Sequence, residues 1–304
     1  MDLYLAGADS WEKSITLDIF KYPHRLASYH YLRQNPKAPE ILAMARQEGT
    51  SWIMDSGLYS LMFGSEQGTL TTMEQAVEYT AQYLKTMAEW DWPHVIVEAD
   101  VQRLLGVDQC QKLREDFFEP YEAATGREVM YVWHIPDGEQ RLREMARKYR
   151  RVALSVPELR ACLSVAEGHE SGTIRKALVK MLSIIRSEGS AKVHLLGCTE
   201  SKLLDLPADT GDSTSWIAAG TWGKGKVVKG GTHLETVSIY SPKYKAWSDK
   251  LRANPRWKDS FDELDRWVEE NRTPEQIPGA KWYSFTTASG VVAYWLVMEA
   301  INAR

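Results

Sequence analysis

The sequence predicts a (β/α)8 barrel, and three observations support this fold class. Eight short apolar runs of strand length are distributed between residues 3 and 217. Segments with helical periodicity separate most of these runs, and alternating strands and helices form parallel sheets with right-handed crossovers. Polar and acidic residues follow the ends of the runs, where barrel enzymes build their active sites. An open doubly wound sheet is the alternative, because two of the runs hold only three residues.

The expected strands, in chain order, are Leu3–Ala6, Leu26–Tyr29, Trp52–Met54, Val95–Ala99, Val129–Trp133, Val152–Leu154, Val193–Leu196 and Ser213–Ile217. The expected helices between them are Pro39–Gln47, Met73–Trp90, Gln109–Thr125, Glu139–Arg150 and Ile174–Arg186. In the second of these helices the apolar residues recur about every 3.6 positions, as on the buried face of a helix.

The character of the chain changes after Trp222. A Gly/Lys loop, a strand, a charged helical region, a Pro-bounded break and a last helix are expected at Trp222–Gly231, Leu234–Tyr240, Pro242–Asn271, Thr273–Gly279 and Ala288–Ala303. We therefore expect residues 1–230 to form the barrel and residues 231–304 to be a C-terminal extension packed on it, not an independent domain.

Composition narrows the class of protein. With 44% hydrophobic and 26% charged residues, the chain is expected to be soluble and globular with an ample core. We expect no signal peptide, since Met1–Ala6 has no basic region, and no membrane span, since no apolar run reaches about 18 residues. Cys110, Cys162 and Cys198 lack metal-type spacing, which favours a reduced, cytoplasmic protein. The net charge of −4 means that nucleic acid would need a local basic patch.

The segment Asp55-Ser56-Gly57 follows the third apolar run and precedes Tyr59. At the end of a barrel strand, Asp55 and Ser56 would face the active site. Gly57 would allow a sharp backbone turn and the close approach of a flat ligand. The same tripeptide is also an ordinary turn, in which the Asp side chain bonds to its own backbone.

Asp212 lies in a second segment rich in Gly, Ser and Thr, about 155 residues after Asp55. Two carboxylates from distant strands can face each other across one pocket, as glycosyl transfer requires of its nucleophile and its proton donor. Asp212 as a helix or turn cap ahead of Ser213 is the alternative.

Further candidates follow other strands. Asp100, two residues after Glu98, would offer a carboxylate to the N–H groups of a purine edge, whereas the alternative is one buried ion pair and one helix cap. His134 follows the fifth run and is either a site residue or a structural histidine. Ser155 follows the sixth run. His194 lies within an apolar run, which favours a core histidine.

The basic residues form two groups. Lys224, Lys226 and Lys229 follow Asp212 closely enough to contact a nucleic-acid backbone, or they form a solvated loop without the spacing of a P-loop. The run of basic residues Arg141–Arg151 is typical of a solvated helix face. No metal-binding motif and no redox cofactor are expected.

Two of these segments resemble a known family. Met54-Asp55-Ser56-Gly57-Leu58-Tyr59-Ser60 resembles the Asp-Ser-Gly-Gly-aromatic-Gln motif of tRNA-guanine transglycosylases. Gly211–Trp216 resembles the second aspartate motif of their smaller relatives, the phage and bacterial DpdA-like transglycosylases that install 7-deazaguanine bases in DNA. Leu26–Leu32 and His194–Gly197 are also similar to that group. The likeness covers roughly residues 1–230, and only the two aspartate motifs are specific.

The resemblance implies a (β/α)8 barrel and a role for each matching residue. Asp212 would attack C1′ of a guanosine nucleotide to form a covalent glycosyl-enzyme, and Asp55 would be the general acid/base. The resemblance also implies a base pocket lined by Ser56, Gly57, Tyr59, Asp100, His134 and Ser155, with Tyr59 stacked on the base.

Two departures favour the DNA-acting group. This chain is shorter than the tRNA enzymes and lacks their Cys-x-Cys-x-x-Cys…His zinc site. Leu58 and Ser60 replace the second glycine and the glutamine of the first motif, which leaves the identity of the inserted base open. The expected partners are DNA, with tRNA as the alternative, and a 7-deazaguanine co-substrate. Two other functions also stay open: hydrolysis that releases the free base, and a non-catalytic barrel that binds nucleic acid. The oligomeric state stays open too, and a homodimer is one possibility.

Overall fold

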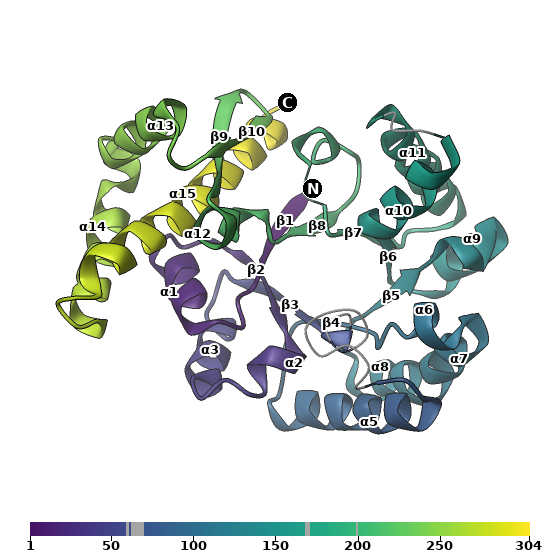
Figure 1. Ribbon diagram of the computed structural model, residues 1–304. Coiled ribbons are helices and arrows are strands. Elements are labelled where there is room, and N and C mark those ends of the chain that lie inside the picture. Colours follow the sequence, from purple (N-terminus) through teal and green to yellow (C-terminus); the bar gives the residue numbers. More distant parts are fainter. Residues whose placement is uncertain (59–60, 62–69, 168–170, 199) are drawn as a thin grey trace.

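The predicted (β/α)8 barrel is confirmed by the computed structural model, which describes residues 1–304 except 59–60, 62–69, 168–170 and 199 (Figure 1). The eight strands of the closed barrel are β1 (Asp2–Ala6), β2 (His24–Ser28), β3 (Ser51–Asp55), β4 (Val95–Val97), β5 (Val129–Trp133), β6 (Arg151–Ser155), β7 (Lys192–Leu196) and β8 (Thr210–Ser213). Each strand pairs in parallel with the next, and β8 closes the barrel on β1 with Tyr4 beside Asp212.

The expected bounds of the eighth strand were wrong. Ser213–Ile217 was expected, but β8 is Thr210–Ser213, and Ser215–Ile217 forms a short 3-10 helix (η4). Thr, Gly, Asp and Ser favour turns over strands, whereas Trp216-Ile217 has the apolar character of a strand. Hydrogen bonding to β7 on one side and β1 on the other overrides this local preference.

The helices surround the barrel (Figure 1). They are α1 (Trp11–Ile19), α2 (Tyr29–Leu32), α3 (Ala38–Ala45), α5 (Met73–Glu89), α6 (Gln102–Leu105), α7 (Val107–Leu113), the π-helix η1 (Arg114–Phe118), α8 (Glu119–Thr125), the 3-10 helix η2 (Ile135–Asp137), α9 (Gly138–Lys148), α10 (Val156–Glu167) and α11 (Ser171–Glu188). The sequence did not indicate α1 or α10. In α5 a capping box of Thr72 and Gln75 satisfies the first backbone N–H groups, and Tyr83 and Met87 are buried beneath it.

The barrel interior is apolar at mid-height and polar towards its ends. Inward-facing residues of β1–β6 form one cluster, made of Tyr4, Ala6, Leu26, Ile53, Val97, Met130, Val132 and Ala153. Side chains alternate along each strand, so the same inward face continues to Asp55 on β3 and Ser155 on β6. Apolar packing therefore fills the middle of the barrel between β1 and β6, and polar residues continue this inward face at the carboxyl end.

The expected Gly/Lys loop was also wrong. After the 3-10 helix η3 (Ser201–Leu203) and the short helix α12 (Ala218–Trp222), residues Lys224–Gly230 form β9, which pairs antiparallel with β10 (His233–Ser238). Val227 is buried on one face of this hairpin, and Gly225 lets the Tyr244 ring pack against the backbone, where a Cβ would lie 2.2 Å from the ring. Alternating burial therefore stabilises β9, although its glycines and lysines are typical of a loop.

The chain ends in three helices, α13 (Pro242–Arg252), α14 (Pro255–Asn271) and α15 (Ile277–Asn302). Helix α15 begins eleven residues before the expected last helix, within the expected break. It packs against β1, α1 and η4, and a Cβ on Gly290 would lie 2.2 Å from the carbonyl oxygen of Trp216. Among the described residues α15 alone is long and apolar enough to cross a membrane, and 67% of its apolar window is buried inside the protein.

Candidate active site

The structure brings most of the predicted site residues to the carboxyl end of the barrel. Asp55 and Ser155 are the last residues of β3 and β6, and His134 directly follows β5. Asp212 lies within β8 and not in a cap, and Asp100 follows β4 after Glu98 and Ala99. We call this group of side chains, together with Asp9 after β1, the barrel mouth.

Asp55 is affected by the charges of three other aspartates of the barrel mouth, Asp9, Asp100 and Asp212. Its Oδ2 accepts a hydrogen bond of 2.9 Å from the backbone N–H of Gly57, so the turn expected as the alternative is also present. Burial, helped by the charges of Asp212, Asp100 and Asp9, raises the pKa of Asp55 to about 7 against the lowering effect of the Gly57 bond. At neutral pH this carboxyl group therefore exchanges a proton readily.

Asp212 has a different environment. Its Oδ1 accepts hydrogen bonds from the Nε2 of His194 at 3.1 Å and from the backbone N–H of Gly197 at 2.9 Å. Both donors bind the charged form of a carboxylate well. The two aspartates thus share a site but differ in environment: Asp212 Oδ1 accepts two hydrogen bonds, whereas the pKa of Asp55 is raised to about 7.

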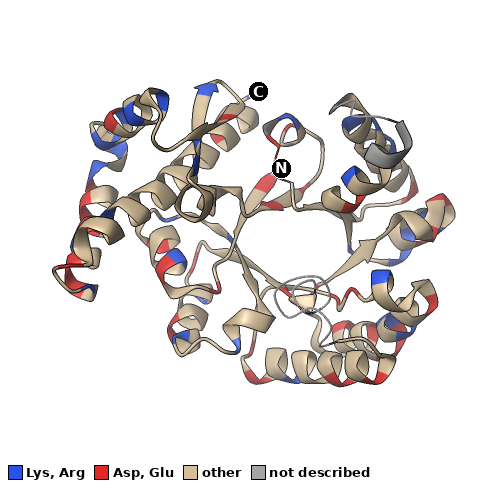
Figure 2. Ribbon diagram, in the orientation of Figure 1, with Lys and Arg blue, Asp and Glu red and all other residues tan. Residues whose placement is uncertain are grey.

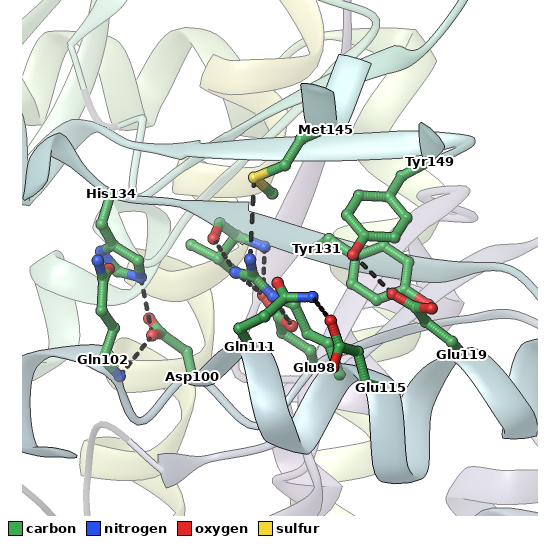
Figure 3. A network of polar contacts seen from close by, with 12 residues as sticks. Glu98, Asp100, Gln102, Gln111, Glu115, Glu119, Tyr131, His134, Met145 and Tyr149 are labelled. Atoms are coloured by element: carbon green, nitrogen blue, oxygen red, sulfur yellow. Dashed lines mark hydrogen bonds and ion pairs between the residues drawn. The ribbon is translucent and has the colours of Figure 1, made fainter. Parts of the chain in front are cut away.

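Asp100 and His134 form a third part of the site (Figure 3). The Nε2 of His134 lies 2.7 Å from Asp100 Oδ1, and its Nδ1 lies 2.8 Å from Glu158 Oε2. Burial opposes a charge on His134, but the two carboxylates outweigh it and raise the pKa of His134 to about 10. The ring is therefore an imidazolium, with both nitrogens donating to carboxylates. His134 would act on a ligand by orienting Asp100, whose side chain is 32% exposed.

Glu98 belongs to the structural framework. It is buried with Arg114 of η1, which donates to both carboxylate oxygens at 2.7 Å, and the N–H of Val132 donates to Oε1. The buried ion pair considered for this segment is present at Glu98. Strand β4 ends at Val97, so Glu98 and Asp100 both lie beyond it. Glu98 pairs with Arg114, whereas Asp100 pairs with His134.

In the segment Asp55-Ser56-Gly57, at the end of β3, the backbone is tightly constrained at Gly57. Its φ of +78° is a left-handed conformation, and a Cβ there would lie 2.4 Å from the Cβ of His30 and 2.5 Å from the Oγ of Ser28. Ser56 is buried, and its carbonyl accepts from the Tyr79 hydroxyl at 2.5 Å. Tyr59 lies outside the described residues.

Gly57→Ala is expected to lower the free energy of unfolding by roughly 3 kcal/mol or more, because the new methyl group meets both steric clashes and a strained φ. The matched control is Gly126→Ala, which has φ +69° but no atom within 4 Å of the new Cβ. Strain alone should cost this control about 1 kcal/mol. Urea unfolding of the two variants measures the difference, and equal losses would show that the space beside Gly57 is not tight.

Other polar groups complete the barrel mouth. Ser155 Oγ accepts from the N–H of Glu158 at 3.3 Å, at the start of α10. Sequence reasoning missed Asp9, whose Oδ1 accepts from the N–H of Ser28 at 3.1 Å and whose pKa is raised by burial. Its position three residues after β1 was the available signal. Glu158 carried no such signal, because α10 was not expected.

The candidate backbone-binding lysines lie on β9. Lys224 and Lys229 are exposed, and Lys226 donates to the Thr236 hydroxyl at 2.8 Å, with its pKa lowered by burial. Strand β10 packs against η3, which follows the carboxyl end of β7. The turn of the hairpin contacts the end of the chain, where Arg304 Nη2 donates to the Thr232 hydroxyl at 3.5 Å.

Within the described part of the chain, no group of three or more His, Cys, Asp or Glu side chains is arranged to hold a metal ion. The site as described consists of acids, the His134 imidazolium, the His194 ring, serine hydroxyls and backbone donors. Comparison of the chain with protein-family models, with curated proteins and with solved structures found no match in any of the three.

Proposed function

We propose that this protein is a guanine transglycosylase that exchanges guanine in DNA for a 7-deazaguanine base of the preQ0 type. The observation that carries the proposal is the unlike environment of Asp55 and Asp212 at one barrel mouth. Double displacement at a sugar carbon needs one carboxylate that stays charged and one that gains and loses a proton. Asp212, which accepts two hydrogen bonds, and Asp55, whose pKa is raised to about 7, are proposed for these two roles, and the reaction needs no redox cofactor.

The proposed reaction has two balanced halves. A carboxylate oxygen of Asp212 attacks C1′, the C1′–N9 bond breaks, and the guanine N9 leaves with the electron pair and takes the proton of Asp55. The incoming 7-deazaguanine then loses its N9 proton to the Asp55 carboxylate and attacks C1′, which releases Asp212. The covalent ester retains the bond energy of the glycosidic linkage, so the exchange requires no external energy source.

The proposed base pocket uses Asp100 as its recognition group. Its Oδ1 is held by His134, so its partly exposed carboxylate is oriented to accept from the N–H groups of a purine edge. Gly57 holds the turn beside Asp55, because His30 and Ser28 fill the space that a Cβ would need, and it stays in the proposal as a neighbour of the base. Ser56, Ser155 and Tyr59 are retained as pocket residues in this proposal.

A nucleic-acid substrate is supported by the charge of one segment. The whole chain holds 37 Lys and Arg against 41 Asp and Glu, but residues 222–258 hold nine against two. Lys and Arg recur along β9 and α13 (Figure 2). Trp222 and Tyr240, at the base of the hairpin, are 66% and 83% exposed, and exposed aromatic rings are surfaces on which bases stack. This segment would hold the strand that flanks the target guanosine.

Replacing both Lys224 and Lys229 by Glu is expected to weaken DNA binding and to flatten its salt dependence, because two phosphate contacts are lost. The slope of log K against log salt should fall by about 2. The matched control replaces Lys85 and Lys176, two exposed lysines on α5 and α11, by Glu. Fluorescence anisotropy at several salt concentrations measures both doubles, and equal effects would show that only net charge matters.

The test of the function is base exchange by the purified protein. Duplex DNA, single-stranded DNA and tRNA are each incubated with labelled guanine and labelled 7-deazaguanines. Label entering DNA, and absent with Asp212→Asn, is the expected result. Label entering only tRNA would move the substrate to tRNA, and release of free guanine without incorporation would indicate a hydrolase. A protein that binds DNA equally with and without Asp55 and Asp212, with no exchange, would be a reader.

A further inference from the structure

A continuous chain of hydrogen bonds crosses the barrel interior and ends on Asp212. Arg151 Nη1 donates to Thr210 Oγ1 at 3.0 Å, and Thr210 Oγ1 lies 2.8 Å from His194 Nδ1. The Nε2 of His194 then lies 3.1 Å from Asp212 Oδ1. Arg151, Thr210 and His194 are each at most 6% exposed, so water does not compete for these bonds. Arg151 was expected on a solvated helix face, but it is the first residue of β6.

The chemistry of the groups gives this chain a direction. An arginine side chain only donates, so the Thr210 oxygen accepts from Arg151 and has its own proton left to donate to His194 Nδ1. A histidine that accepts at Nδ1 carries its proton at Nε2, which is the nitrogen facing Asp212. Burial lowers the pKa of His194, which keeps the ring neutral. Glu128 holds the far end by accepting from Arg151 Nε at 2.6 Å.

We propose that Thr210 and His194 are positioning residues that select which oxygen of Asp212 attacks the sugar. This inference rests on the proposed function, because it assigns Asp212 the role of nucleophile. Oδ1 receives two donors, His194 Nε2–H and the Gly197 N–H, which fix the rotation of the carboxylate. Oδ2 is then the attacking atom, and Oδ1 becomes the carbonyl oxygen of the ester. No proton moves along the chain in this step.

The arrangement follows from strand register. His194 pairs with Thr210 on neighbouring strands β7 and β8, and both face inward. Asp212 is two residues beyond Thr210, so it lies on the same inward face one layer nearer the barrel mouth. Replacing Thr210 therefore breaks the chain without touching Asp212 or the barrel mouth.

The first test reads the tautomer of His194 and needs no activity. Nitrogen-15 NMR of the full chain at neutral pH should show His194 protonated at Nε2 and unprotonated at Nδ1, with the signal assigned by its loss in His194→Gln. Thr210→Val should remove this preference, and Thr210→Ser should retain it. A signal protonated at Nδ1, or one unchanged by Thr210→Val, would overturn the inference whatever the protein catalyses.

The second test reads the rate of adduct formation with duplex DNA in single-turnover experiments. Thr210→Val should slow it by roughly 10- to 100-fold with DNA affinity unchanged, because the attacking oxygen is no longer held in place. Thr210→Ser should restore most of the rate, and His194→Gln, which keeps a donor near the Nε2 position, should exceed His194→Leu. Thr80→Val, the same change at a buried threonine of α5, controls for lost stability.

The outcomes separate this inference from the proposed function. An active protein whose Thr210→Val rate equals that of the wild type would remove the positioning role and leave the transglycosylase assignment standing. A wild-type protein with the fixed tautomer but no adduct in any polymer would remove the reaction and leave the hydrogen-bond chain to Asp212 standing. Loss of DNA affinity in Thr210→Val would also contradict a role confined to the nucleophile.

Discussion

Asp212→Asn is expected to abolish the covalent adduct, with a loss of exchange on the order of 10⁴-fold or more. The amide nitrogen is not a nucleophile towards C1′, so the first half of the reaction has no attacking group. The amide oxygen can still accept from His194 and Gly197, as Oδ1 does now, and the fold should therefore be preserved. Mass spectrometry of denatured protein after incubation with DNA measures the adduct.

The control for Asp212→Asn is Asp209→Asn. Asp209 lies three residues earlier, where its carboxylate accepts from Arg186 and from the N–H of Val193, away from the barrel mouth. This variant should form the adduct at the wild-type rate. An adduct that survives Asp212→Asn at normal yield would assign the nucleophile elsewhere and sink the proposed mechanism.

Asp55→Asn is expected to slow both halves of the exchange by roughly 10²- to 10⁴-fold, because each half moves one proton through this residue. The wild-type enzyme should show opposite pH dependences in the two halves. The pKa of Asp55 is raised to about 7, mainly by burial and then by the charges of Asp212, Asp100 and Asp9. Below that pH the group is protonated and serves base departure, and above it the carboxylate accepts the proton of the incoming base.

Two single-turnover series measure this behaviour. Adduct formation from DNA should fall as the pH rises through about 7, and consumption of the isolated adduct by 7-deazaguanine should fall as the pH drops through the same value. Both profiles should flatten in Asp55→Asn, where slow adduct formation persists. Two profiles that move in the same direction with pH would contradict a single group acting as both acid and base.

Sequence pattern alone was sufficient for the architecture of the barrel. Strand alternation and helical periodicity are local properties, so the apolar runs from Leu3–Ala6 to Val193–Leu196 each overlap a strand of the structure. The same pattern placed Asp55 and Ser155 at strand ends, because an apolar run that stops at a polar residue marks the carboxyl end of a strand. Local information failed at β8 and β9, where pairing and packing with distant segments stabilise poor strand formers.

Only the tertiary structure decided the chemistry of the barrel mouth. The raised pKa of Asp55 depends on burial and on charges carried by Asp9, Asp100 and Asp212, which are far apart in sequence. Electrostatic interaction falls with distance in space and not along the chain, so no pattern in the sequence reports it. The sequence identified His194 only as a core histidine, and strand register gave it hydrogen bonds to Thr210 and Asp212. Residue types and strand ends are therefore properties of the sequence, whereas protonation and orientation come from the closed barrel.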